Sequence, residues 1–303
     1  MKIGYLFSGQ GQQFPGMGSD LYQNNDTYRN VVDTASRTLN LDLSDPKVFD
    51  DPENTQVAIL TMSYGIYRIL ADQLPKAQAM MGLSLGEYSA LVSAKALSFQ
   101  SGLKLVRDRS HYMDEAGKQN PGSMAAVLKI DPDVVVDVTS KIDGAYPANF
   151  NTSEQTVIGG TKAGVEKASA VLKERGAKRV VPLKVAVSSH TPLMQLASDL
   201  LAKRMENVTF KTPTIPVISN TDVGLFNENN LADTLTRQLV NPTHFREDLE
   251  LMVNNYGVDT LIEIGPGNTL TKFVKKTLKD VNAYSVDSLK KLTDLQEKLG
   301  LED

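Results

Sequence analysis

The pentapeptide Gly82-Leu83-Ser84-Leu85-Gly86 has the residue types and spacing of an exposed serine nucleophile. An apolar, strand-like run at residues 77–81 precedes it, and a helix-like run at residues 87–92 follows it. A Gly-x-Ser-x-Gly sequence between a strand and a helix predicts a sharp turn that presents the serine hydroxyl at the helix N-terminus. The glycines are needed there because side chains would collide with the neighbouring strand and helix. We therefore predict nucleophilic chemistry at Ser84; the alternative is a tight turn with an incidental serine.

A serine nucleophile needs a base at neutral pH, and histidine is the commonest one. The sequence has three histidines, at positions 111, 190 and 244. We favour His190, because it lies where a predicted strand is followed by a predicted helix, and such element ends hold side chains rigidly. His244, in a polar turn, and His111 are the alternatives. No single acidic residue stands out as the group that orients the base, and a backbone carbonyl oxygen would also serve.

One arginine of the predicted helix at residues 101–117 lies on the apolar face, where a cation is not solvated. At about 100° per residue, Arg109 falls within the apolar arc of the helix, whereas Arg107 and His111 fall on the polar half. A buried guanidinium is unfavourable unless it is paired. Its partner is either a buried Asp or Glu, or a carboxylate that arrives with a substrate and accepts two hydrogen bonds from the planar group.

The loop at residues 8–18 is rich in glycine but fits neither the dinucleotide-binding nor the phosphate-binding pattern. Its position after the first predicted strand can bring backbone N–H groups near Ser84. An oxyanion hole needs two such donors. We predict that the N–H of Leu85, directly after the serine, is one donor and the N–H of Gln10 the other. A plain turn is the alternative for the loop.

The elements that must position these residues alternate between strands and helices in the first third of the chain. The predicted strands are residues 3–7 and 77–81, and the predicted helices are 26–39, 56–72 and 101–117. This alternation predicts a mostly parallel sheet that is covered by helices on both faces. After residue 189 the same character returns, with helices at 190–205 and 269–278, strands at 217–219 and 260–264, and a helix-prone tail after residue 288.

The middle of the chain has a different order, β-α-β-β-α-β, which is that of the ferredoxin-like module. Its predicted strands are residues 123–130, 146–151, 156–159 and 179–187, and its predicted helices are 131–142 and 161–175. We therefore predict an α/β protein in two units. Residues 1–122 and 190–303 form the large core, and residues 123–189 form a smaller subdomain inserted into it.

Composition excludes several classes of function. The 303 residues carry a net charge of −4, which argues against general nucleic-acid binding. The absence of cysteine excludes disulfides, thiolate metal sites and a cysteine nucleophile. No run approaches the ~18 apolar residues that a membrane helix needs, and the first apolar stretch is too short for a signal peptide. We expect a cytoplasmic protein that binds no membrane and no metal.

Several separated stretches resemble the malonyl-CoA:acyl-carrier-protein transacylases of bacterial fatty acid synthesis. The resemblance covers nearly the whole chain and keeps one order of blocks. The matching blocks are residues 7–13, 82–92, 109, 149–151, 189–194, 237–242 and 263–267. It implies an α/β-hydrolase-like core with a ferredoxin-like subdomain, in agreement with the pattern of predicted elements.

The resemblance also implies a ping-pong acyl transfer without cofactor or metal. Ser84 would be the nucleophile, His190 the base, and Arg109 the group that binds the free carboxylate of the malonyl group. Malonyl-CoA would donate the acyl group to Ser84, and the phosphopantetheine thiol of acyl carrier protein would then accept it. A serine esterase or thioesterase, or an acyltransferase subunit of a polyketide or malonate decarboxylase system, remains an alternative.

By the same resemblance, the amides of Gln10 and Leu85 form the oxyanion hole, and the backbone carbonyl of Gln238 orients the base. Two positions depart from the family pattern. Leu83 stands where many members have histidine, which affects how the malonyl end or the arginine is held. His244 stands where Gln or Trp types are usual, which weakens its candidacy as a base.

A carrier protein is expected to be acidic and would dock on a local basic patch of the enzyme, which we expect to be a monomer. The candidate basic residues are Lys178 and Arg179 of the subdomain, or Lys272, Lys275 and Lys276 near the C-terminus. An ordinary solvated face is the alternative for each group.

Overall fold

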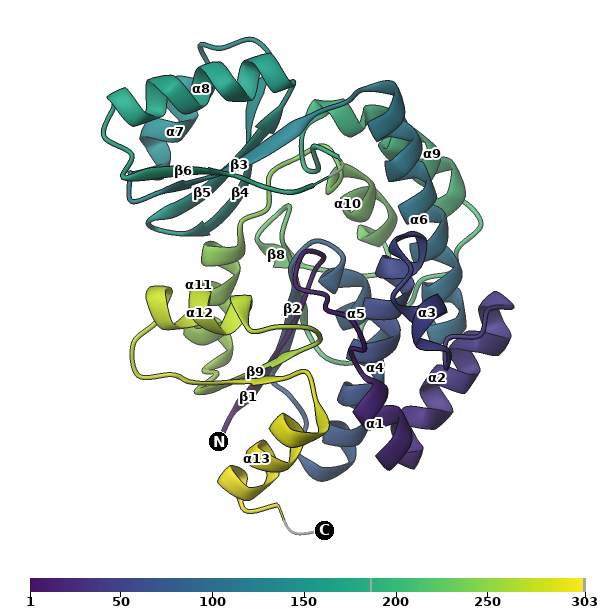
Figure 1. Cartoon of the computed structure of the whole chain (residues 1–303). Coiled ribbons are helices and arrows are strands. Elements are labelled where there is room, and N and C mark those ends of the chain that lie inside the picture. The colour runs from purple at the N-terminus through teal and green to yellow at the C-terminus, as the bar shows by residue number, and fades with distance from the viewer. Residues whose placement is uncertain (186, 302–303) are drawn as a thin grey trace.

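Two separate β-sheets organise the chain, in a computed structural model that describes residues 1–185 and 187–301 (Figure 1). The larger sheet has six strands in the order β10-β9-β1-β2-β7-β8. These strands are β1 (Ile3–Phe7), β2 (Ala79–Gly82), β7 (Val217–Ser219), β8 (Gly224–Leu225), β9 (Thr260–Ile264) and β10 (Asn282–Val286). The short β8 is antiparallel to β7, and the other pairings are parallel. The prediction of a mostly parallel sheet is therefore confirmed.

Helices cover both faces of this sheet, so successive residues of a central strand enter different cores (Figure 1). Tyr5 and Phe7 of β1 belong to one apolar cluster and Leu6 to the other, because neighbouring side chains of a strand point to opposite faces. The helices that contribute to the first cluster include α4 (Thr55–Gln73), α5 (Gly86–Ser93) and α6 (Phe99–Gln119), and those of the second are α11 (Phe245–Tyr256) and α12 (Thr269–Thr277).

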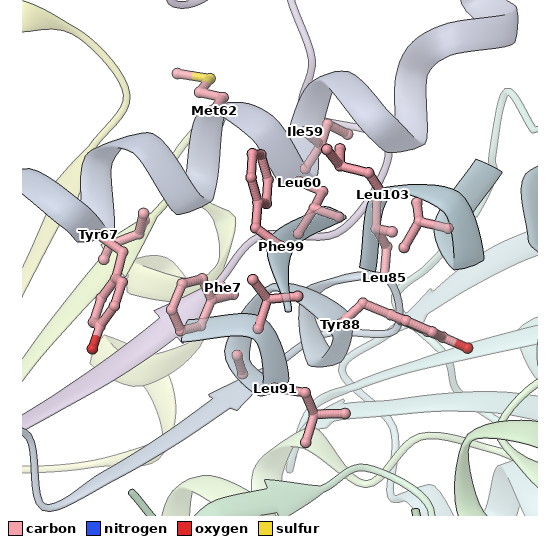
Figure 2. Close-up of a cluster of buried hydrophobic side chains, with 14 of the residues drawn as sticks. Phe7, Ile59, Leu60, Met62, Tyr67, Leu85, Tyr88, Leu91, Phe99 and Leu103 are labelled. Carbon is pink, nitrogen blue, oxygen red and sulfur yellow. The ribbon is translucent and has the colours of Figure 1, made fainter. Parts of the chain in front are cut away.

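The first cluster fixes the short helix that follows the pentapeptide. Figure 2 shows Leu85 and Tyr88 among the side chains of β1, α4 and α6. All eight residues of α5 are buried, and they are apolar on most sides, as a helix between two layers must be. The start of α5 is therefore held rigidly against the carboxyl ends of β1 and β2.

The smaller sheet has four antiparallel strands in the order β4-β5-β3-β6. Its elements are β3 (Ser123–Leu128), α7 (Pro132–Thr139), β4 (Ala145–Thr152), β5 (Gln155–Gly160), α8 (Lys162–Glu174) and β6 (Arg179–Pro182). Both helices lie on one face of the sheet and close a core of their own (Figure 1). Each begins at a capping side chain, Asp131 for α7 and Thr161 for α8. The ferredoxin-like order is confirmed, and the boundaries at residues 123 and 189 stay a prediction.

Two predicted elements are wrong at the exit of the smaller sheet. The strand predicted at residues 179–187 ends at Pro182, because its partner β3 begins at Ser123 and offers little further length; residue 186 lies outside the described residues. The helix predicted at residues 190–205 begins only at Gln195, after a 3-10 turn at Pro192–Met194. Pro192 forces the residue before it into an extended conformation, so the helix cannot start earlier.

The remaining helices pack around the large sheet. They are α1 (Ser19–Asn24), α2 (Asp26–Leu39), α3 (Pro46–Phe49), α9 (Gln195–Met205), α10 (Leu231–Arg237) and α13 (Leu289–Leu299). The sequence patterns do not predict α1, α3, α10, α11, β8 or β10. Among the residues that the structure describes, no helix is both long and apolar enough to cross a membrane.

Candidate active site

Ser84 lies on a sharp turn between β2 and α5, with a left-handed φ of 53° that non-glycine residues rarely adopt. The glycines on either side are required by close packing. A Cβ at Gly82 would lie 2.0 Å from the carbonyl carbon of Gly86, and a Cβ at Gly86 would lie 2.1 Å from the backbone oxygen of Phe7. The strand, the turn and the helix can approach this closely only with glycine at both positions.

His190 is the histidine that contacts Ser84. Its Nε2 lies 2.9 Å from Ser84 Oγ, and its Nδ1 lies 2.7 Å from the backbone oxygen of Gln238. A carbonyl oxygen only accepts hydrogen bonds, so Nδ1 carries the proton and Nε2 is free to accept the proton of the serine hydroxyl. His190 has a left-handed φ of 62°, and its own N–H donates to the backbone oxygen of Leu239 at 2.9 Å.

Burial keeps His190 neutral. It lowers the pKa of His190 to about 4; the hydrogen bond from Nδ1 to Gln238 opposes this shift and the charge of Arg109 adds to it. The imidazole is therefore unprotonated at neutral pH, as a general base must be. The other two histidines form no hydrogen bond with Ser84. His111 is exposed, and the His244 ring stacks on Phe150 with 5.2 Å between the ring centroids.

Arg109 is fully buried, as the helical wheel predicts, whereas Arg107 is exposed. The Arg109 guanidinium donates to Gln56 Oε1 at 2.7 Å, to Gln238 Oε1 at 3.1 Å and to Ser84 Oγ at 3.2 Å. Its charge also lies over the ring of Tyr88, 5.3 Å from the centroid. Within residues 1–185 and 187–301, no carboxylate forms an ion pair with it. The cation is held by neutral groups beside the serine hydroxyl.

The side chain of Gln238 connects this cation to a buried acid. Its Oε1 accepts from Arg109, and its Nε2 donates to Glu87 Oε2 and, at 3.0 Å, to the backbone oxygen of Ser84. Burial raises the pKa of Glu87 to about 8, although its hydrogen bonds from Asn220 and Gln238 oppose that shift. Glu87 thus stabilises the amide that orients Arg109 without forming an ion pair with Arg109.

The backbone N–H groups of Leu85 and Gln10 have no acceptor among the described residues, and the same is true of Gly9 beside Gln10. Leu85 follows Ser84 directly. The loop that carries Gln10 touches the turn, since a Cβ at Gly9 would lie 2.6 Å from the backbone oxygen of Leu83. The loop therefore lies where a second N–H donor could approach the serine.

The structure brings together five of the sequence-predicted residues by direct contact or chain adjacency: Ser84, Leu85, Arg109, His190 and Gln238. Sequence reasoning missed Gln56, Glu87 and Asn220. Glu87 carries a signal that could have found it, an acid in a helix whose other side chains are all uncharged. Gln56 and Asn220 have no such local signal. In the described part of the chain, no group of three or more His, Asp or Glu side chains could hold a metal ion.

Comparison with known proteins identifies the family of this chain. The sequence profile of the family described as "Acyl transferase domain" matches residues 4–298. The "Malonyl CoA-acyl carrier protein transacylase" of Haemophilus influenzae is 37% identical over an alignment of 313 residues, gaps included, which covers 98% of this chain and 99% of that one. The crystal structure of "MCAT from Streptococcus pneumoniae" superposes with a TM-score of 0.93 at 38% identity, over 98% of this chain and 100% of that one.

A second solved structure is a complex of a type II PKS acyl-carrier protein with its malonyl-transacylase. Its matching chain is 33% identical and has a TM-score of 0.92, with 98% of this chain and 100% of that chain covered. The family profile spans residues 4–298, a range that includes every residue of the serine site described above. By family profile, sequence identity and fold, this chain belongs to the acyl transferase domain family.

Proposed function

We propose that this protein transfers a malonyl group from coenzyme A to the phosphopantetheine thiol of an acyl carrier protein, a step of fatty acid synthesis. The observation that carries the proposal is the buried Arg109 guanidinium, which lies 3.2 Å from Ser84 Oγ. An acyl group bound to Ser84 would extend beside this cation, so an acyl group that ends in a carboxylate is favoured. The names of its relatives support the same donor and acceptor.

In the first half-reaction, Ser84 Oγ attacks the thioester carbonyl of malonyl-CoA while His190 Nε2 takes the hydroxyl proton. The carbonyl becomes a tetrahedral oxyanion, which the N–H groups of Leu85 and Gln10 would stabilise. The C–S bond then breaks, and the leaving thiolate of coenzyme A takes the proton from His190. A malonyl ester remains on Ser84, with its free carboxylate paired to Arg109.

In the second half-reaction, the phosphopantetheine thiol of the carrier protein gives its proton to His190 Nε2 and attacks the ester carbonyl. The tetrahedral intermediate collapses with cleavage of the C–O bond, and Ser84 Oγ takes the proton back from His190. The products are malonyl-carrier protein and the free serine. Throughout, the Gln238 carbonyl holds His190 Nδ1–H, so that Nε2 faces the reacting oxygen in both directions.

The acidic carrier protein would dock on exposed cations of this chain. Lys178 and Arg179 on the smaller subdomain are exposed, as are Lys272, Lys275 and Lys276 on α12. None of these five side chains has a salt-bridge partner among the described residues. We propose these two groups as the surfaces to be tested for carrier-protein docking.

The test is mass spectrometry of the intact protein after brief exposure to malonyl-CoA. We expect one malonyl adduct, which disappears when carrier protein bearing phosphopantetheine is added and reappears as malonyl-carrier protein. The Ser84→Ala variant should acquire no adduct. A stable adduct on Ser84→Ala would overturn the nucleophile assignment, and release of free malonate at the same rate with or without carrier protein would identify a hydrolase instead.

A further inference from the structure

The backbone N–H of Ser84 is bound by a side chain that lies 136 residues later in the sequence. Asn220 Oδ1, in the loop after β7, accepts this hydrogen bond at 2.8 Å. We propose that Asn220, held by the buried carboxyl group of Asp248, is a positioning residue that fixes the nucleophile turn in its reactive conformation. The inference rests on the proposed role of Ser84 as the nucleophile.

Asn220 is fully buried, and each of its polar groups has a partner. Its Oδ1 binds the Ser84 N–H, and its Nδ2 donates to Asp248 Oδ2 at 2.7 Å. Its backbone N–H donates to Glu87 Oε1, and its backbone oxygen accepts from the N–H of His244 at 2.9 Å. A residue with four fixed partners has little freedom to rotate, so it can impose a position on the turn.

Asp248 decides which way the Asn220 amide faces. A carboxylate oxygen accepts the Nδ2–H donor, which leaves Oδ1 directed at Ser84. In the flipped orientation, Nδ2 would face the Ser84 N–H, so the hydrogen bond that holds the turn would be lost. Asp248 is itself buried, and this side-chain bond with Asn220 is the one that the structure gives it.

The turn needs such a partner because of its own geometry. Ser84 has a left-handed φ, which its side chain disfavours. Two hydrogen bonds run within the turn, from the N–H of Gly86 to the oxygen of Leu83 and from the N–H of Glu87 to the oxygen of Ser84. Two others reach it from outside: Gln238 Nε2 donates to the Ser84 oxygen, and the N–H of Leu83 donates to the oxygen of Phe7, each at 3.0 Å. The Ser84 N–H points out of the turn, and Asn220 Oδ1 accepts its hydrogen bond. Without that acceptor, other conformations become competitive and Ser84 Oγ leaves His190 Nε2.

The same network reaches the cation. Glu87 accepts one hydrogen bond from the Asn220 backbone and another from the Gln238 side chain, and Gln238 binds Arg109. Asn220 touches neither Arg109 nor His190 by hydrogen bond. Its loss should therefore lower the rate of Ser84 acylation more than it changes the binding of malonyl-CoA.

The test exchanges the two side chains. In Asn220→Asp, a second buried carboxyl group faces Asp248. Two carboxyl groups this close cannot both be ionised, so they share a proton, and no fixed donor decides which oxygen faces the Ser84 N–H. In the double variant Asn220→Asp with Asp248→Asn, the amide introduced at position 248 can donate to the carboxylate introduced at position 220. The other oxygen of that carboxylate accepts from the Ser84 N–H, and the net charge is unchanged. Rapid-quench mass spectrometry at varied malonyl-CoA gives the acylation rate constant and the half-saturating concentration for each protein.

We expect Asn220→Asp to lower the acylation rate constant on the order of 10- to 100-fold at a nearly unchanged half-saturating concentration, a range typical of coupled side chains in contact. The double variant should recover most of this loss. Asn25→Asp is the matched control, because Asn25 Oδ1 also accepts a backbone N–H, that of Tyr28 at 2.9 Å, at the start of α2. It introduces the same side chain and should keep the wild-type rate.

The outcomes separate the inference from the function on which it rests. A wild-type protein that acquires no malonyl adduct overturns the proposed function itself. If the wild type is acylated, an Asn220→Asp protein with an unchanged rate, or a loss shared by Asn25→Asp, overturns the role of Asn220. If Asn220→Asp does not fold, the double variant decides: a folded protein acylated within about tenfold of the wild-type rate supports the pair, and an unfolded or slower one overturns it.

Discussion

The Arg109 guanidinium is bound by the neutral amides of Gln56 and Gln238 and, in the part of the chain that the structure describes, has no anionic partner. Placing an acid beside it tests whether its free charge selects the acyl group. The Gln56→Glu substitution replaces an amide oxygen 2.7 Å from Arg109 Nη1 with a carboxylate oxygen of nearly the same shape. Because an acid beside an arginine stays ionised, the introduced carboxylate would form a buried ion pair with Arg109. The cation would then be neutralised before any substrate arrives.

The size of the effect follows from the charges. A malonyl carboxylate about 4 Å from Arg109 gains about 4 kcal/mol at an effective dielectric constant of about 20. The carboxylate introduced at position 56, about 6 Å from the malonyl carboxylate, would repel it by about 3 kcal/mol on the same basis. A repulsion of this size should lower kcat/KM for malonyl-CoA about 100-fold. Acetyl-CoA has no free carboxylate and should be affected far less.

The assay compares kcat/KM for acylation of Ser84 by malonyl-CoA and by acetyl-CoA. The matched control is Gln100→Glu, which adds the same charge to α6, the helix of Arg109, at an exposed position nine residues away. That separation is about 13 Å along the helix axis, beyond the distance at which exposed charges act strongly in physiological salt. Equal losses with both donors, or a change in the malonyl-to-acetyl ratio below about fivefold, would refute the reasoning, because the charge of Arg109 would then not select the acyl group.

Three further results are expected. Arg109→Ala should lose malonyl transfer while acetyl transfer is kept or rises, measured by the same two-donor assay; a parallel loss of both would make Arg109 a structural residue. In a pH profile of kcat/KM, which reports the free enzyme, acylation should fall only as the pH drops toward the His190 pKa of about 4, since the neutral imidazole is the base; an inflection near 6.5 would contradict its burial. Gly86→Ala should abolish folding or lower the melting temperature strongly, because the new Cβ would lie 2.1 Å from the backbone oxygen of Phe7; a protein with wild-type thermal melting would show that the strand and helix can separate at no cost.

The parts of the site that local patterns encode could be predicted from the sequence. The Ser84 turn follows from glycines at fixed spacing between a strand and a helix, and the burial of Arg109 follows from the helical period alone. The position of His190 between elements favours it as the base, although its surroundings differ from the prediction: a left-handed residue and a 3-10 turn precede α9.

The residues that sequence reasoning missed act through contacts between distant segments. Asn220 binds a turn 136 residues earlier, and Gln56 binds an arginine 53 residues later. No periodicity links such pairs, because they meet only after the sheet has brought β2, β7 and the helices together. The end of β6 likewise depends on the length of its partner β3, which is not a property of its own residues.

The central place of β1 in the large sheet has a consequence for how the protein is made. β1 is hydrogen-bonded on one side to β2 and on the other to β9, and Asp259, just before β9, follows Lys2 by 257 residues. At about 5–20 residues per second, a ribosome would need about 13–50 s to supply that second neighbour. Until then one edge of a strand whose five residues are all buried in the finished protein is open to other chains. The first strand to be synthesised thus receives its second neighbour near the end of synthesis. Until that point, another part of the chain or another protein must cover the open edge of β1 to prevent aggregation.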